Sequence, residues 1–93
     1  MISKHEMNKA ITIAKEYGVG KLYLVGSALD KPSKEVHDYD FAVDDYDPSL
    51  FFRFYSKLFQ AMSKTVDLID LSGEQTLFKK IVRSEGRLIY ERK

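Results

Sequence analysis

The chain has 93 residues, of which 44% are hydrophobic, and a formal net charge of +1 at pH 7. A chain of this length buries roughly 60–65% of its unfolded surface, which predicts one domain, residues 1–93, with a modest core. The near-neutral charge gives no electrostatic reason to expect a nucleic-acid partner, and the lack of cysteine excludes disulfides and thiolate chemistry. No apolar run is long enough to span a bilayer, so we expect a cytoplasmic protein without a membrane partner.

The first predicted element is a helix that begins at a capping box, Ser3-Lys4-His5-Glu6. Gly18 and Gly20 are expected to end it. Its apolar positions recur at helical spacing and predict a buried stripe: Met7, Ala10, Ile11, Ala14 and Tyr17.

A short β-prone run, residues 21–25, precedes Gly26 and Ser27. Glycine allows a tight turn whose backbone N–H groups are free to bind an anion, and the Ser27 hydroxyl can contact the same anion. The pair therefore predicts a phosphate-binding turn at the end of a strand.

A second strand is predicted over residues 38–43, with two aspartates at alternate positions. The strand period of two places Asp38 and Asp40 on one face, about 7 Å apart, and the apolar residues between them on the other face. Two such carboxylates suit Mg²⁺, which prefers carboxylate and phosphate oxygens. A structural calcium site or a plain solvated acidic loop is the alternative, although the segment lacks the glycine and glutamate spacing of an EF-hand.

The second predicted helix covers residues 48–62 and begins with Asp47-Pro48, a cap followed by proline. Its core stripe comprises Phe51, Phe54, Tyr55, Leu58 and Met62. Phe52 and Phe59 widen this stripe beyond one face, which indicates either a broad core contact or a docking surface for another protein or a second copy of the chain.

Residues 65–71 predict a third strand with two aspartates of opposite parity, so only one of Asp67 and Asp70 can share the face of Asp38 and Asp40.

A third helix is expected after a cap in Ser72-Gly73-Glu74-Gln75, with Leu77, Ile81 and Val82 inward. A final strand would follow Gly86. This order predicts an α/β (α+β) fold, in which a small mixed sheet of about four strands has helices packed on one face and leaves the other face for a site.

Charge is distributed unevenly along the chain. Five aspartates lie within residues 38–47, and six basic residues lie near the end: Lys79, Lys80, Arg83, Arg87, Arg92 and Lys93. We interpret the basic segment as a solvated helix face rather than a nucleic-acid or phosphate patch.

Gly26-Ser27, a spacer of ten residues and Asp38-Tyr39-Asp40 together resemble the signature of the minimal nucleotidyltransferase (MNT) family of the DNA polymerase beta superfold. The resemblance covers nearly the whole chain, because residues 65–71 resemble the third strand of the family and residues 81–90 its final helix, turn and strand. It implies that Asp67 is the third carboxylate, which acts as general base for the acceptor hydroxyl or holds the metal that activates it.

The resemblance also implies an activity and a partner. Members of this size are typically MntA-like antitoxins, which transfer AMP from ATP to a small helical HEPN ribonuclease toxin in the presence of Mg²⁺ or Mn²⁺. The chain would then be a protein adenylyltransferase with Asp38, Asp40 and Asp67 as catalytic and metal-binding residues and Gly26 and Ser27 as nucleotide-binding residues. A homo- or hetero-oligomer is compatible with this assignment.

The chain departs from the family pattern beside the glycine turn. Ala28, Leu29 and Asp30 stand where members commonly have an arginine-rich stretch, and His37 stands where they have serine. The nearest cations are Lys31 and Lys34. These departures favour one alternative, a catalytically silent module of the same fold that neutralises its partner by contact.

Overall fold

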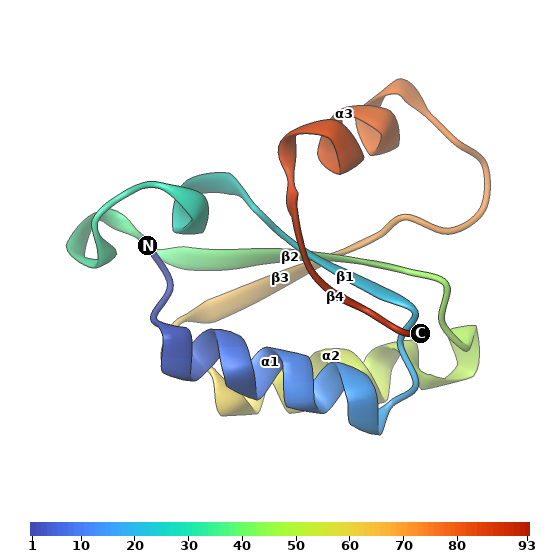
Figure 1. Ribbon diagram of the computed structural model, residues 1–93, viewed down its shortest axis with the longest axis horizontal. Coiled ribbons are helices and arrows are strands. Elements are labelled where there is room, and N and C mark those ends of the chain that lie inside the picture. The colour runs from blue at the N-terminus through green and yellow to red at the C-terminus, as the bar shows by residue number, and fades with distance from the viewer.

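The computed structural model describes residues 1–93, apart from the side chain of Ser33. The regular elements follow the predicted order of helices and strands (Figure 1). They are α1 (Lys4–Glu16), β1 (Lys21–Val25), β2 (Asp38–Asp44), α2 (Phe51–Ala61), β3 (Thr65–Asp70), α3 (Leu77–Glu85) and β4 (Arg87–Glu91). Three short 3-10 turns lie between them: η1 (Gly26–Leu29), η2 (Ser33–Glu35) and η3 (Pro48–Leu50).

The four strands form one mixed sheet in the order β3-β2-β1-β4. Strand β1 is antiparallel to β2 and β4, whereas β2 and β3 are parallel. The register pairs Val25 with Asp40 and Asp40 with Asp67. The end of β1 and the beginnings of β2 and β3 therefore meet at one edge of the sheet, which confirms the predicted mixed sheet of four strands.

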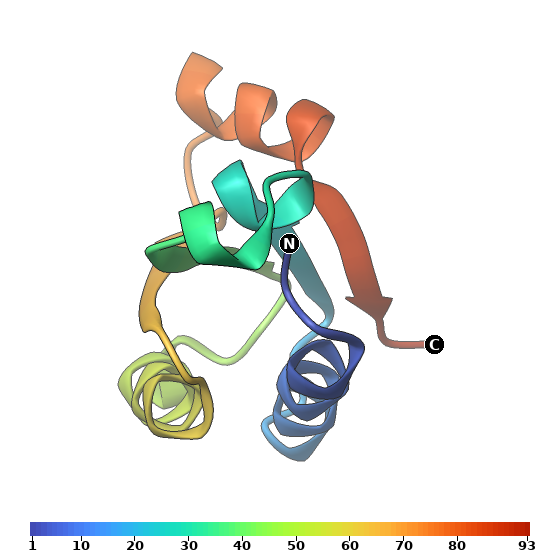
Figure 2. The same ribbon diagram turned by 90° about the vertical axis from the view of Figure 1, so that its left-hand side faces the viewer.

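Helices α1 and α2 lie side by side under one face of the sheet (Figures 1 and 2). Ala10, Ile13 and Ala14 of α1 and Phe54 and Leu58 of α2 are buried against that face. Ile13, which the predicted stripe omitted, is among them. This layer contains the main core, and the side chains of Tyr39, Phe41 and Val43 reach it from β2.

Helix α3 lies on the opposite face, above the sheet in Figure 1. Its buried residue Val82 packs with Tyr23, Ala42 and Leu71 in a second, smaller cluster. The expectation that helices cover one face thus holds for α1 and α2, whereas α3 occupies part of the face that was expected to be open. Arg83 of α3 adds polar contacts to this packing, because it donates to Asp44 and to the Leu71 carbonyl.

Two helix beginnings differ in how well they were predicted. Ser3 caps α1 by accepting a hydrogen bond from the Glu6 backbone N–H at 3.1 Å, as the capping box predicts. Helix α3 is capped by Thr76 instead of residues 72–75, because the Thr76 hydroxyl accepts from the Lys79 backbone N–H. The prediction that Leu77 and Ile81 point inward is wrong, since both are exposed and only Val82 is buried.

The second helix also begins later than predicted. Asp47 caps η3 through the backbone N–H of Ser49, and the α-helical geometry starts only at Phe51.

No helix among the described residues has the length and apolar character that crossing a membrane requires.

Candidate active site

Gly26 ends β1 and begins η1 in a conformation that requires glycine. Its φ is 72°, and a Cβ at this position would lie 2.7 Å from Oδ2 of Asp40. Strain and lack of space both exclude a side chain, so the backbone of the turn lies directly against the Asp40 carboxyl group. Ser27 follows in η1 and is half-buried. The predicted phosphate turn and the predicted carboxylates therefore lie together.

The structure brings the three predicted carboxylates to neighbouring positions on two strands. Asp38 and Asp40 alternate along β2 around the buried Tyr39, whose ring belongs to the core on the other face. Asp40 and Asp67 are register partners across the parallel β2–β3 pair. Adjacent strands are about 4.8 Å apart, so the two side chains leave the sheet next to each other.

The carboxylates interact electrostatically. Burial raises the pKa of Asp40, and the negative charges of Asp67 and Asp38 and a hydrogen bond with Asp67 raise it further. Every one of these influences disfavours the ionised form of Asp40. A bound cation would reverse the effect, because it would offset the repulsion that the three carboxylates exert on one another.

The donor chemistry of this cluster fits a hard divalent cation, since all three groups are carboxylates. The side chains do not yet surround one point: among the described residues, no group of three or more histidine, cysteine, aspartate or glutamate side chains is arranged to hold a metal ion. The backbone register therefore supports the predicted cluster, and an ion would have to draw the side chains together.

Asp70, the alternative third carboxylate, has a different environment. Its Oδ1 accepts hydrogen bonds from the backbone N–H and the hydroxyl of Ser72, at 2.9 and 2.6 Å. Burial acts to raise the pKa of Asp70, but the hydrogen bonds from Ser72 and Tyr46 outweigh it and lower the pKa. Burial and the hydrogen bond to Asp70 in turn raise the pKa of Tyr46 to about 12. Asp70 thus stabilises the turn that follows β3.

The residues at which the chain departs from the family pattern lie beside the turn. Ala28 is buried and Leu29 packs against the core, whereas Asp30 and His37 are exposed. The backbone N–H groups of Asp30 and Lys31 both donate to the Ser27 carbonyl. The stretch after Ser27 is therefore used for packing and for closing the turn.

A pocket of about 240 Å³ adjoins the carboxylates, and the sequence analysis missed it. Gly26, Asp40 and Ile69 form its sheet side, and α3 forms the other side with Phe78, Ile81, Val82 and Glu85. The available signal is the apolar content of α3, in which the sequence pattern predicts that Leu77, Ile81 and Val82 all point inward.

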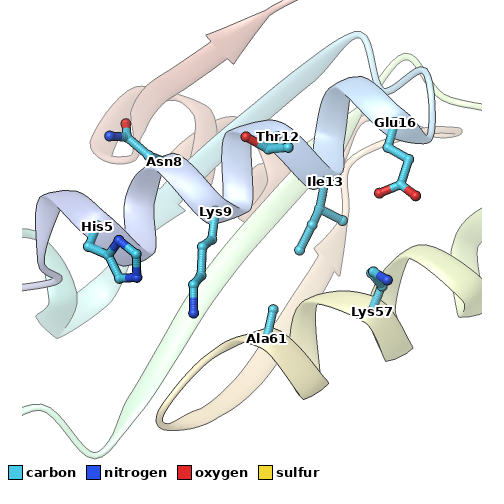
Figure 3. Close-up of a pocket in the computed structure, with 8 residues that line it drawn as sticks. All are labelled: His5, Asn8, Lys9, Thr12, Ile13, Glu16, Lys57 and Ala61. Carbon is cyan, nitrogen blue, oxygen red and sulfur yellow. The ribbon is translucent and has the colours of Figure 1, made fainter.

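Another hollow, of about 380 Å³, lies between α1 and α2 (Figure 3). Its lining includes Lys9, Glu16 and Lys57, and Figure 3 shows these side chains on the facing sides of the two helices. It lies on the face of the sheet opposite to the carboxylates, because α1 and α2 pack under the face that contains Tyr39. Its mixed charges are typical of a solvated helix surface.

Comparison with known families assigns the chain to one of them. The family model described as "Polymerase beta, Nucleotidyltransferase" matches residues 8–93, so the chain belongs to this family of nucleotidyltransferases. No curated protein matches the chain.

Several solved structures have a similar fold. One is a crystal structure of the toxin-antitoxin MntA-HepT, with 24% identity, a TM-score of 0.70 and coverage of 97% of this chain and 74% of that chain. A second, a toxin-antitoxin with AMP-PNP, has 26% identity, a TM-score of 0.70 and coverage of 94% and 74%. A third, a tri-AMPylated Shewanella oneidensis HEPN toxin in complex with MNT antitoxin, has 24% identity, a TM-score of 0.71 and coverage of 98% and 74%.

Proposed function

We propose that this chain is a metal-dependent nucleotidyltransferase that transfers AMP from ATP to a hydroxyl group of a partner protein, and that it silences a HEPN toxin in this way. The observation that carries the proposal is the meeting of three elements at one sheet edge, where Gly26 lies against Asp40 and Asp40 lies in register with Asp67. The similarity to toxin-antitoxin structures with an ATP analogue and with an AMPylated toxin supports the choice of nucleotide and partner.

In this proposal Asp38, Asp40 and Asp67 hold Mg²⁺ or Mn²⁺. The ion would neutralise phosphate charge and help to orient the reacting oxygens. Gly26 and Ser27 bind phosphate oxygens through backbone N–H groups and the Ser27 hydroxyl. Positioning and charge neutralisation account for most of the catalysis of nucleotidyl transfer, so no covalent intermediate on the chain is required.

The reaction is an in-line displacement. The acceptor hydroxyl oxygen forms a bond to the α-phosphorus of ATP, and the bond from the α-phosphorus to the oxygen that bridges to the β-phosphorus breaks. Pyrophosphate leaves with the electron pair of that bond. Asp67, an exposed carboxylate at the edge of the cluster, accepts the hydroxyl proton.

The partner would dock on the exposed aromatic surface of α2, which we define as Phe52 and Phe59. These side chains are 81% and 50% exposed, and they line a hollow of about 410 Å³ together with Tyr55, Ser56 and Gln60. Exposed aromatic side chains of this kind are typical anchors of protein interfaces. The cytoplasm, where ATP is available, stays the predicted location.

Transfer to the partner is the decisive experiment. Wild-type chain, a HEPN toxin, Mg²⁺ and radiolabelled ATP should give a toxin that is heavier by one or more AMP groups. Asp40→Asn should bind the toxin equally well and leave it unmodified. If Asp40→Asn neutralises the toxin as well as wild type does and neither chain leaves an adduct, the protein acts by contact alone.

Docking is tested separately from chemistry. Phe52→Ala or Phe59→Ala should weaken binding to the toxin by about 1–4 kcal/mol, as expected for truncation of an aromatic anchor. Lys80→Ala is the control, because Lys80 is exposed on α3 and lies outside the lining of this hollow. Equal binding by all three variants would place the interface elsewhere.

A further inference from the structure

The pocket beside the carboxylates has a composition that the phosphate and metal chemistry does not require. Its α3 wall presents Phe78, which is 59% exposed, and Ile81, which is 45% exposed. Ile69 from β3 and Val25 from β1 add apolar surface on the sheet side. Leaving such side chains exposed forgoes the stability that burying them would provide, so a ligand with an apolar face is the natural occupant.

The position of the pocket indicates which part of the reaction it serves. Among the described residues, its lining includes Gly26 of the phosphate turn and Asp40 and leaves out Asp67, the residue that faces the acceptor hydroxyl in the proposed function. The pocket thus adjoins the nucleotide side of the site. An acceptor side chain would have to approach at the beginning of β3, where Asp67 lies.

The size of the pocket also limits its occupant. At about 240 Å³ it is smaller than the ~300–1,000 Å³ typical of sites that enclose a drug-sized ligand. A nucleoside triphosphate would not fit inside, whereas a single aromatic ring system would. The Glu85 carboxylate in the lining disfavours phosphates inside the pocket, because like charges repel.

We propose that this pocket binds the base of the nucleotide, which stacks between the apolar surface of Ile69 and the side chains of Phe78 and Ile81. The inference rests on the proposed function, because it places the phosphates at Gly26 and Ser27. Base stacking on an aromatic side chain tolerates every base, and the Glu85 carboxylate at the rim favours a base with an amino group that can donate a hydrogen bond to it.

The experiment compares two ligands that differ in the presence of a nucleoside. Calorimetry with Mg²⁺ measures binding of AMP-PNP and of inorganic triphosphate to wild type, Phe78→Ala and Ile81→Ala. Loss of the stacking surface should weaken AMP-PNP binding by about 5- to 100-fold and leave triphosphate binding within about twofold of wild type.

Two further variants control for the fold and for the type of contact. Leu77→Ala removes a neighbouring apolar side chain of α3 that is 75% exposed and lies outside the pocket lining, and it should bind both ligands like wild type. Phe78→Tyr keeps the aromatic ring and should retain AMP-PNP affinity. Thermal unfolding of each variant verifies that α3 is still folded.

The possible outcomes distinguish failure of the base pocket from failure of the proposed function. If wild type binds both ligands and the Phe78 and Ile81 variants bind AMP-PNP unchanged, the base lies elsewhere and the proposed function still stands. Equal loss of both ligands would likewise overturn the base pocket. If wild type binds neither ligand, the nucleotidyltransferase proposal fails and the base pocket fails with it.

Discussion

Strand β2 has aspartates at both ends, and their surroundings differ. At its beginning, Asp40 has the carboxylates Asp38 and Asp67 as its charged neighbours. At its end, Asp44 forms an ion pair with Arg83 at 2.8 Å, and the following Asp45 forms one with Arg92 at 3.1 Å. What the sequence presents as one acidic segment is therefore two sites, one that concentrates negative charge and one that neutralises it.

The difference indicates which end serves chemistry. Carboxylates that stabilise a fold usually have cationic partners, as Asp44 has in Arg83 and Asp45 has in Arg92. A cluster that raises the pKa of its own member makes the folded protein less stable at neutral pH, and such clusters are typical of functional sites. The ion pairs also give a structural role to two residues of the basic C-terminal segment, Arg83 and Arg92.

The largest expected effect comes from removing charge at the beginning of β2. Asp38→Asn or Asp40→Asn should abolish Mg²⁺-dependent ATP binding and AMP transfer, measured by calorimetry and by label on the toxin. Because the folded state raises the pKa of Asp40, Asp40→Asn should unfold at the same temperature as wild type or higher. Asp45→Asn is the control at the other end and should keep full activity. Undiminished ATP binding in both variants would contradict the assigned site.

The next prediction compares the two aspartates of β3. Asp67→Asn should slow transfer by roughly 10²-fold or more, as expected for loss of a general base, with little change in nucleotide affinity. Asp70→Asn should matter much less for transfer, because Asp70 bonds to Ser72 on the other side of the strand. Single-turnover transfer assays measure both rates, and a reversed order would refute the choice of Asp67.

A third prediction concerns the end of β2, where Arg83 neutralises Asp44. Arg83 donates to Asp44 and to the Leu71 carbonyl at 2.8 and 2.9 Å, and both Arg83 and Asp44 are partly buried. Arg83→Ala should lower the free energy of unfolding by about 1–3 kcal/mol, because it leaves a carboxylate and a carbonyl without their donor. Lys80→Ala, at an exposed position on the same helix, should change it by less than about 0.5 kcal/mol. Urea unfolding measures both values.

The smallest expected effect is on stability, and it comes from Glu6, which contacts the beginning of β2 through Tyr39. Glu6 accepts hydrogen bonds from the hydroxyl of Tyr39, which lies between the two β2 aspartates, and from Ser63. Burial acts to raise the pKa of Glu6, but these hydrogen bonds outweigh it and lower the pKa below its ordinary 4.5. The stability that they contribute is therefore complete above that value and is lost as the pH falls through the lower pKa of the folded state.

Glu6→Gln tests this dependence on pH. The variant should be about 1 kcal/mol less stable than wild type at pH 7, since hydrogen bonds to a charged acceptor are stronger than those to a neutral one. The gap should narrow as the pH falls below 4.5 and should close below the lowered pKa of Glu6 in the folded state, where the wild type takes up a proton. Glu16→Gln, exposed on the same helix, should follow wild type over the whole range. If the difference in stability between the two proteins persists at acidic pH, the negative charge of Glu6 is not the source of its contribution.

Patterns of short range were sufficient to predict much of the protein. The capping box at Ser3, the glycine turn at Gly26 and the alternation of Asp38 and Asp40 depend on residues that are close in the chain, and the structure reproduces each of them. The wide apolar stripe of the second helix left open whether Phe52 and Phe59 pack in the core, and the structure leaves both exposed. The order of the helices and strands followed from the same local periodicities.

Tertiary contacts decided the rest, because they join residues that are far apart in the chain. The parallel pairing of β2 with β3 placed Asp67 beside Asp40 and directed Asp70 to Ser72. The packing of Val82 on the sheet set the position of α3, left Phe78 exposed and thereby formed the pocket beside the carboxylates. Sequence periodicity defines which residues share a face of an element, but which two faces meet depends on the packing of the whole chain.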